Sequence, residues 1–164
     1  RRWLIRSDYF GVVGLAHNGF LNGTPPEEIT RAVTLGMYWT PTLELYKGVG
    51  SAAFAQINLK HYVDAGGHVA LGTDYAGYTV KFDLGMPITE IELMHEAGLT
   101  PMQIIVAATR DAAHFCGRDD ILGTLEVGKL ADVLVVNGDP LVDLHALLDV
   151  WLVVHHGQII RETR

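Results

Sequence analysis

The chain has 164 residues, of which 49% are hydrophobic and 19% charged, a composition typical of a globular protein with a buried core. The net charge of −7 disfavours binding to nucleic acid, because the phosphate backbone repels an acidic surface. No apolar run approaches the roughly 20 residues that cross a bilayer, so we expect no role at a membrane.

The first half of the sequence predicts alternating strands and helices. Short apolar runs near Val12, Tyr38 and Val69 have the length and composition of buried parallel strands. Residues 24–35 and 51–65 are expected to form the helices between them, with Thr24 capping the first. A repeat of about 25–30 residues suits βα units, whose parallel strands are joined by right-handed crossovers.

The second half changes character. Residues 87–96 and 100–115 are expected to be helical, and Thr100 with Gln103 forms a capping-box pattern. Residues 131–136, 150–155 and 159–160 are expected to be strands, so a β-rich unit follows the βα series. The neighbours His155 and His156 should point to opposite faces of their strand.

Two polar side chains stand where predicted strands end. His17 follows the apolar run 11–16, and Asp74 follows the run 69–71 after a glycine and a threonine. Ligands bind beyond the C-terminal ends of parallel strands, and imidazole nitrogen and carboxylate oxygen both suit zinc and similar metals. The residues alone leave other interpretations open: His17 as a hydrogen-bonded structural residue, and Asp74 as a turn or helix-capping residue.

Longer motifs resemble a known family. The Gly-Thr-Asp of residues 72–74 ends an apolar strand, and further motifs lie at residues 15–17, 40–43, 92–94, 96–101, 107–109, 122–136 and 153–160. Together they resemble the amidohydrolase superfamily, and within it the branch of imidazolonepropionase and prolidase. The combination Gly-Lys-Leu-Ala-Asp at residues 128–132 is the most specific of these motifs.

The resemblance implies an α/β fold. Residues 1–118 would hold strands six to eight of a (β/α)8 barrel with their helices, and residues 119–164 part of a small β-sandwich domain.

The resemblance also implies an enzyme and its cofactor. The family pattern is a metal-dependent hydrolase of C–N bonds, here amide or cyclic amide bonds of a small-molecule substrate, with one or two divalent metals, which we expect to be zinc. Asp74 would bind the metal and act as general base, and His17 would be a second metal ligand. Tyr75 and Tyr78, in the loop after Asp74, would contact the substrate.

Part of the family pattern is missing. The first-strand His-x-His pair, the bridging ligand and the fifth-strand His have no counterpart in this sequence. We therefore expect a fragment that associates with its missing N-terminal half or forms a homo-oligomer. A deaminase of the same superfamily and a non-catalytic fragment that assembles with other chains are the alternatives. Cys116 is the only cysteine and no apolar leader follows Arg1, which favours a cytoplasmic location.

Overall fold

The first three strands form a parallel sheet. The computed structural model describes residues 14–17, 23–74 and 81–163. Strands β1 (Gly14–Ala16), β2 (Tyr38–Thr40) and β3 (His68–Val69) pair in the order β1-β2-β3. The predicted parallel strands are therefore confirmed, although residues 11–13 of the first one lie outside the described part of the chain.

The helices between these strands differ in detail from the prediction. Helices α2 (Pro26–Thr34) and α4 (Ala52–Asp64) were expected, but α3 (Leu43–Gly48) was not. The predicted cap of α2 is wrong: Pro25 occupies the N-cap position, and Thr24 is buried with its backbone N–H donating to Asn58 Oδ1 at 2.8 Å.

Three further helices follow the sheet. Helix α5 (Ile88–Glu96) agrees with the prediction, and α6 (Pro101–Ala108) begins with the predicted capping box of Thr100 and Gln103. The expected long helix is broken at Thr109, whose φ of −123° and ψ of −89° are not helical, and α7 (Arg110–Phe115) continues after it. None of the helices in the described ranges is long and apolar enough to span a membrane.

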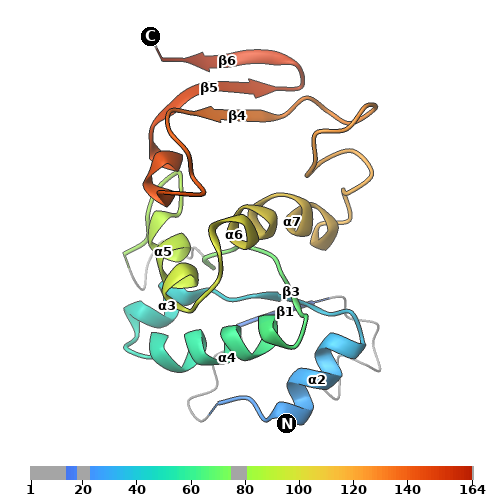
Figure 1. The fold of residues 1–164 in the computed structure, drawn as a ribbon, viewed down its shortest axis with the longest axis vertical. Coiled ribbons are helices and arrows are strands. Elements are labelled where there is room, and N and C mark those ends of the chain that lie inside the picture. Colours follow the sequence, from blue (N-terminus) through green and yellow to red (C-terminus); the bar gives the residue numbers. More distant parts are fainter. Residues whose placement is uncertain (1–13, 18–22, 75–80, 164) are drawn as a thin grey trace.

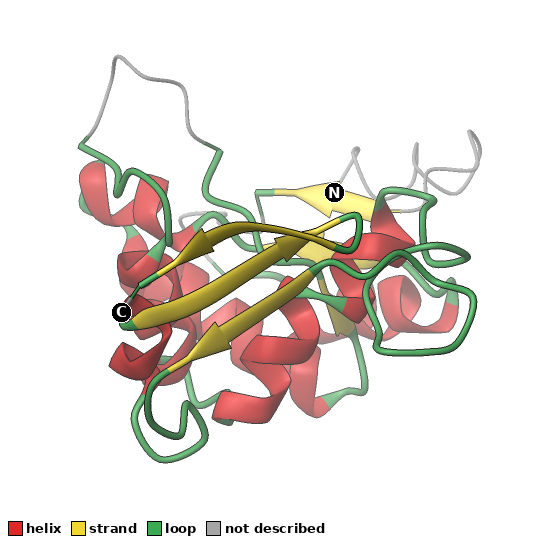
Figure 2. Cartoon of the chain, turned by 90° about the horizontal axis from the view of Figure 1, so that it is seen from above, coloured by secondary structure: helices red, strands yellow, loops and turns green. Residues whose placement is uncertain are grey.

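An antiparallel sheet forms the other end of the molecule. Strands β4 (Val133–Val136), β5 (Val150–His155) and β6 (Gln158–Glu162) pair in that order, and the short 3-10 helix η1 (Leu144–Leu148) precedes β5. In Figure 1 this sheet lies at the top, with α6 and α7 between it and the parallel sheet. Figure 2 shows the three strands crossing over the helices.

The core surrounds β2. Trp39 of β2 is 2% exposed and stacks on Tyr62 of α4, with ring centroids 4.2 Å apart. The Tyr62 hydroxyl donates to the carbonyl oxygen of Met37, which anchors the start of the strand. Leu144 of η1 belongs to the same buried cluster. The parallel strands are thus anchored in the main core, and their pairing fixes their C-terminal ends relative to one another.

Candidate metal centre at the strand ends

Each parallel strand is followed by one residue of a compact polar group. His17 comes directly after β1, Thr42 two residues after β2, and Asp74 five residues after β3. Backbone hydrogen bonds continue the pairing past the strands: the N–H of His17 donates to the Thr40 carbonyl, and that of Thr42 to the Gly72 carbonyl, both at 3.2 Å. The loops therefore begin in fixed positions.

The structure brings the two predicted metal ligands together. His17 Nε2 lies 3.4 Å from Asp74 Oδ2, and the side chains are 41% and 49% exposed. The other ring nitrogen of His17, Nδ1, lies 3.0 Å from Thr42 Oγ1. Thr42 was not predicted as part of the site. Tyr75 and Tyr78, the predicted substrate contacts, lie outside the described residues.

These three residues share an unusual backbone conformation. The φ angles of His17, Thr42 and Asp74 are 65°, 53° and 56°, in the left-handed region. Within the described ranges only one other non-glycine residue, His156, has a positive φ. Such conformations cost of order 1–2 kcal/mol, and they collect at functional sites where surrounding structure enforces them. Thr42 is the most strained of the three, because its side chain is β-branched.

The donor atoms fit a divalent metal. Two ligand atoms that share a zinc ion, each at about 2.0–2.2 Å, lie about 3–4 Å apart, and the His17–Asp74 distance is in that range. A metal-binding histidine normally has its second ring nitrogen held by a hydrogen bond, which Thr42 provides here. The pair supplies two ligands, so a closed site needs others.

A second cluster lies in the antiparallel sheet. Asp132, His155 and His156 form the single group of three candidate metal ligands among the described residues, and all three are exposed. The prediction that the two histidines face apart is wrong, because His156 has a φ of 50° and the two rings stack with centroids 4.0 Å apart. Asp132 Oδ1 accepts the His156 backbone N–H at 2.7 Å and lies 3.0 Å from His155 Nδ1. These contacts fix the turn between β5 and β6.

Sequence reasoning missed a buried carboxylate beside the site. Glu90 of α5 has no exposed surface, and its two oxygens accept the backbone N–H groups of Leu43 at 2.9 Å and Glu44 at 2.7 Å. Glu90 lies one helical turn before the fully buried Met94, so it shares that helix face. This spacing was the signal available in the sequence.

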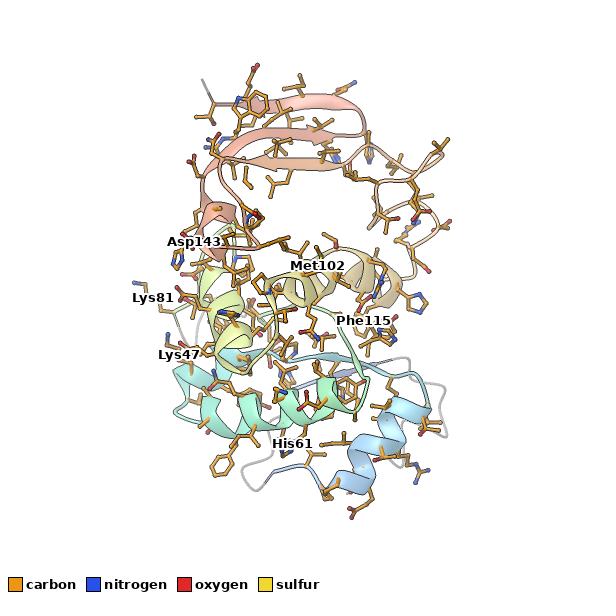
Figure 3. The ribbon with its side chains drawn as sticks, in the orientation of Figure 1. Lys47, His61, Lys81, Met102, Phe115 and Asp143 are labelled. Atoms are coloured by element: carbon orange, nitrogen blue, oxygen red, sulfur yellow. The ribbon has the colours of Figure 1, made fainter. Side chains whose placement is uncertain are left out.

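Two more carboxylates extend this contact. Glu44 is 3% exposed, and its Oε1 accepts the backbone N–H of Asp83 at 2.8 Å. Asp83 Oδ2 in turn accepts the backbone N–H of Thr89 at 2.7 Å. The hydrogen bonds from Thr89 lower the pKa of Asp83, and the charges of Lys47 and Lys81 act in the same direction. Figure 3 shows both lysines on the same side of the molecule.

Burial controls the acid–base behaviour of the two glutamates. Loss of solvent raises the pKa of Glu90 to about 7, although the N–H groups of Glu44 and Leu43 oppose the shift. Burial also raises the pKa of Glu44, against the N–H of Asp83. Near neutral pH, therefore, Glu90 changes charge.

We expect the stability of the protein to depend on pH through Glu90. Its pKa rises from an ordinary 4.5 to about 7 on folding, so the folded state binds the proton more tightly. The resulting stabilisation is fully present below pH 4.5 and is lost as pH rises through 7, at most about 3 kcal/mol. Urea denaturation between pH 4 and pH 8 should show a steeper loss of stability with rising pH in the wild type than in Glu90→Gln, in which Glu44 still contributes to the slope. An equal slope in both proteins would contradict it, and the exposed Glu27→Gln serves as control.

Comparison with known proteins identifies the family. The model of the amidohydrolase family matches residues 11–160. Imidazolonepropionase of Geobacillus kaustophilus (strain HTA426) is 38% identical over 81 residues, which are 48% of this chain and 18% of that protein. S-triazine hydrolase of Gordonia rubripertincta is 32% identical over 103 residues, 59% of this chain and 20% of that protein.

Solved structures agree with this result. The crystal structure of a Xaa-Pro dipeptidase with bound methionine in the active site has a TM-score of 0.82 and 24% identity, covering 98% of this chain and 42% of that chain. The mixed α/β fold is therefore shared with this dipeptidase, and each of these matches spans less than half of the relative's length. The family predicted from the motifs is confirmed: the chain belongs to the amidohydrolase family.

Proposed function

We propose that the chain carries part of the active site of a metal-dependent hydrolase that cleaves C–N bonds of amide or cyclic amide type in a small molecule. The observation that carries the proposal is the meeting of His17 and Asp74 at 3.4 Å, each held in a left-handed conformation at a strand end. Relatives named imidazolonepropionase and S-triazine hydrolase support a C–N bond as the target.

Each residue has a distinct role in this proposal. The site would take a divalent metal, here proposed to be zinc, whose Lewis acidity when bound would polarise the scissile carbonyl. His17 would hold the metal through Nε2, while Thr42 Oγ1 contacts Nδ1 and so fixes the plane of the ring. Asp74 would help to hold the metal with its carboxylate and would accept the proton of the attacking water. Tyr75 and Tyr78 remain predicted substrate contacts.

The proposal also places the chain within a larger architecture. We assign β1, β2 and β3 to the sixth, seventh and eighth strands of a (β/α)8 barrel, and the antiparallel sheet to part of a small β-sandwich domain. In the described ranges β1 and β3 each pair on one side only, so their free edges can accept further strands. The remaining metal ligands would come from strands of this kind, in an N-terminal half or in another copy. A cytoplasmic location remains a prediction.

Removal of metal tests the proposal. Dialysis against a chelator should abolish hydrolysis of amide substrates, and added Zn²⁺ should restore it.

His17→Ala should lower the zinc content of the purified protein, measured by elemental analysis with mass spectrometry. His61→Ala is the control, because this histidine is exposed on helix α4 (Figure 3) and is not one of the residues of the candidate site. Full activity of a protein shown to be free of metal would refute the proposal, and release of ammonia from aminated heterocycles would favour a deaminase.

A further inference from the structure

We propose that Glu90 is a positioning residue, whose buried carboxylate holds the turn after β2 so that the Thr42 hydroxyl orients the His17 ring. The inference rests on the proposed function in one respect only, namely that the oriented ring binds metal. It concerns residues from three separate parts of the chain: the end of β1, the turn before α3, and helix α5.

The first step is the contact between α5 and the start of α3. A carboxylate that is withdrawn from water is costly unless hydrogen bonds replace its solvation. Glu90 meets this condition by accepting two successive backbone N–H groups, those of Leu43 and Glu44, at 2.9 Å and 2.7 Å. With one N–H on each oxygen, the carboxylate fixes both the position and the tilt of this turn.

The second step is the residue that immediately precedes this pair. Thr42 is 1% exposed and has a φ of 53°, which a β-branched residue adopts only when its surroundings impose it. Its N–H donates to the Gly72 carbonyl and its own carbonyl accepts the N–H of Tyr46, both at 3.2 Å. Together with the Glu90 contacts, these bonds hold Thr42 in the conformation that places Oγ1 3.0 Å from His17 Nδ1.

The third step connects the same contacts to the segment after Asp74. Glu44 Oε1 accepts the N–H of Asp83, and Asp83 Oδ2 accepts the N–H of Thr89 in the first turn of α5. The start of α5 therefore anchors both the turn that carries Thr42 and the segment that leads from Asp74 to the helix. A change at Glu90 is expected to disturb the His17 side of the site first, because its two direct partners adjoin Thr42.

A purely structural role is the competing explanation. Glu90 could serve only to satisfy the first N–H groups of α3, in which case its loss lowers stability but leaves the His17 ring unchanged. The positioning role predicts in addition a change in the ring itself. Ring ¹⁵N chemical shifts report which nitrogen of His17 carries the proton, and this measurement needs no metal.

The experiment measures zinc affinity and His17 ring shifts in the full chain. Zinc chloride is titrated against a chromophoric chelator in the wild type, Glu90→Gln, Thr42→Val and Thr42→Ser. We expect Glu90→Gln and Thr42→Val each to weaken zinc binding about 10–100-fold, as is typical when the partner of a metal-binding histidine is lost. The double variant, with Glu90→Gln and Thr42→Val together, should bind zinc about as tightly as the more affected of the two single variants. This is expected because both changes interrupt the same series of contacts. Thr42→Ser keeps the hydroxyl and should bind like the wild type.

The matched control is Glu92→Gln, the same substitution two residues along the same helix, at an exposed side chain that pairs with His145. It should leave zinc affinity and the His17 shifts unchanged. If Glu90→Gln fails to fold, Glu90→Asp keeps the charge, withdraws the carboxylate by one methylene group, and should give the same changes.

Two kinds of failure can be told apart. Wild-type ring shifts and zinc affinity in a folded but less stable Glu90→Gln would overturn the positioning role. If His17→Ala leaves zinc affinity unchanged, the proposed metal site fails. The ring shifts of Glu90→Gln would still decide whether Glu90 orients His17.

Discussion

Under the proposed function, replacing Asp74 with Asn is expected to lower kcat for amide hydrolysis by about 10²–10⁴-fold in a protein that completes the site. The carboxamide cannot accept the proton of the attacking water, and it is a weaker metal ligand than a carboxylate. The substitution should leave the fold intact, because Asn, like Asp, tolerates the left-handed conformation that residue 74 adopts at φ 56°. Steady-state kinetics and a denaturation curve on the same preparation separate the two effects.

The control for this experiment is Asp64→Asn. Asp64 is exposed at the end of α4 and pairs with Lys60 on the surface, so its substitution should change neither kcat nor KM. Wild-type turnover in a folded Asp74→Asn protein would remove Asp74 from the mechanism, whatever its contact with His17.

Trp39→Ala is expected to lower the free energy of unfolding by about 3–5 kcal/mol, a large part of the stability of a domain of this size. Trp39 lies on the central strand β2, is 2% exposed and stacks on Tyr62, so its removal leaves a cavity in the main core. Its Nε1 has no hydrogen-bond partner among the described residues, so the substitution breaks no side-chain hydrogen bond. Urea denaturation followed by circular dichroism gives the value.

Trp151→Ala provides a matched comparison, since Trp151 lies on β5 and is 45% exposed. Trp151→Ala should lower the free energy of unfolding much less than Trp39→Ala, because Trp151 buries less apolar surface on folding. Equal losses in the two variants would show that the parallel sheet is not the centre of stability.

Local signals in the sequence were enough to place most elements. The strands β2 and β3 follow from short apolar runs that end at Pro41 and at Gly72, and the start of α6 follows from the capping box. Helix α3 escaped prediction for a physical reason. Its N-cap residue has a left-handed backbone and no capping side chain, and its first N–H groups bond to Glu90, 46 and 47 residues away. No local pattern encodes such a partner.

The residues of the candidate site also fall into those that the sequence could predict and those that it could not. His17 and Asp74 could be named because a polar residue that follows an apolar strand is recognisable in the sequence itself. The short distance between their side chains then follows from the parallel pairing of the strands. The roles of Thr42 and Glu90 depend on contacts between distant segments, so the sequence alone did not reveal them. The error at His155 and His156 arose because the alternation of a strand was extended across a residue that begins a turn.

The left-handed backbones at the strand ends carry a consequence for protein engineering. Glycine at these positions would relieve the steric conflict, by up to about 1 kcal/mol, and would delete a side chain of the candidate site in the same step. A thermostability screen alone would therefore favour such substitutions while the proposed metal site is lost. Libraries built on this chain should hold His17, Thr42 and Asp74 fixed and seek heat resistance elsewhere.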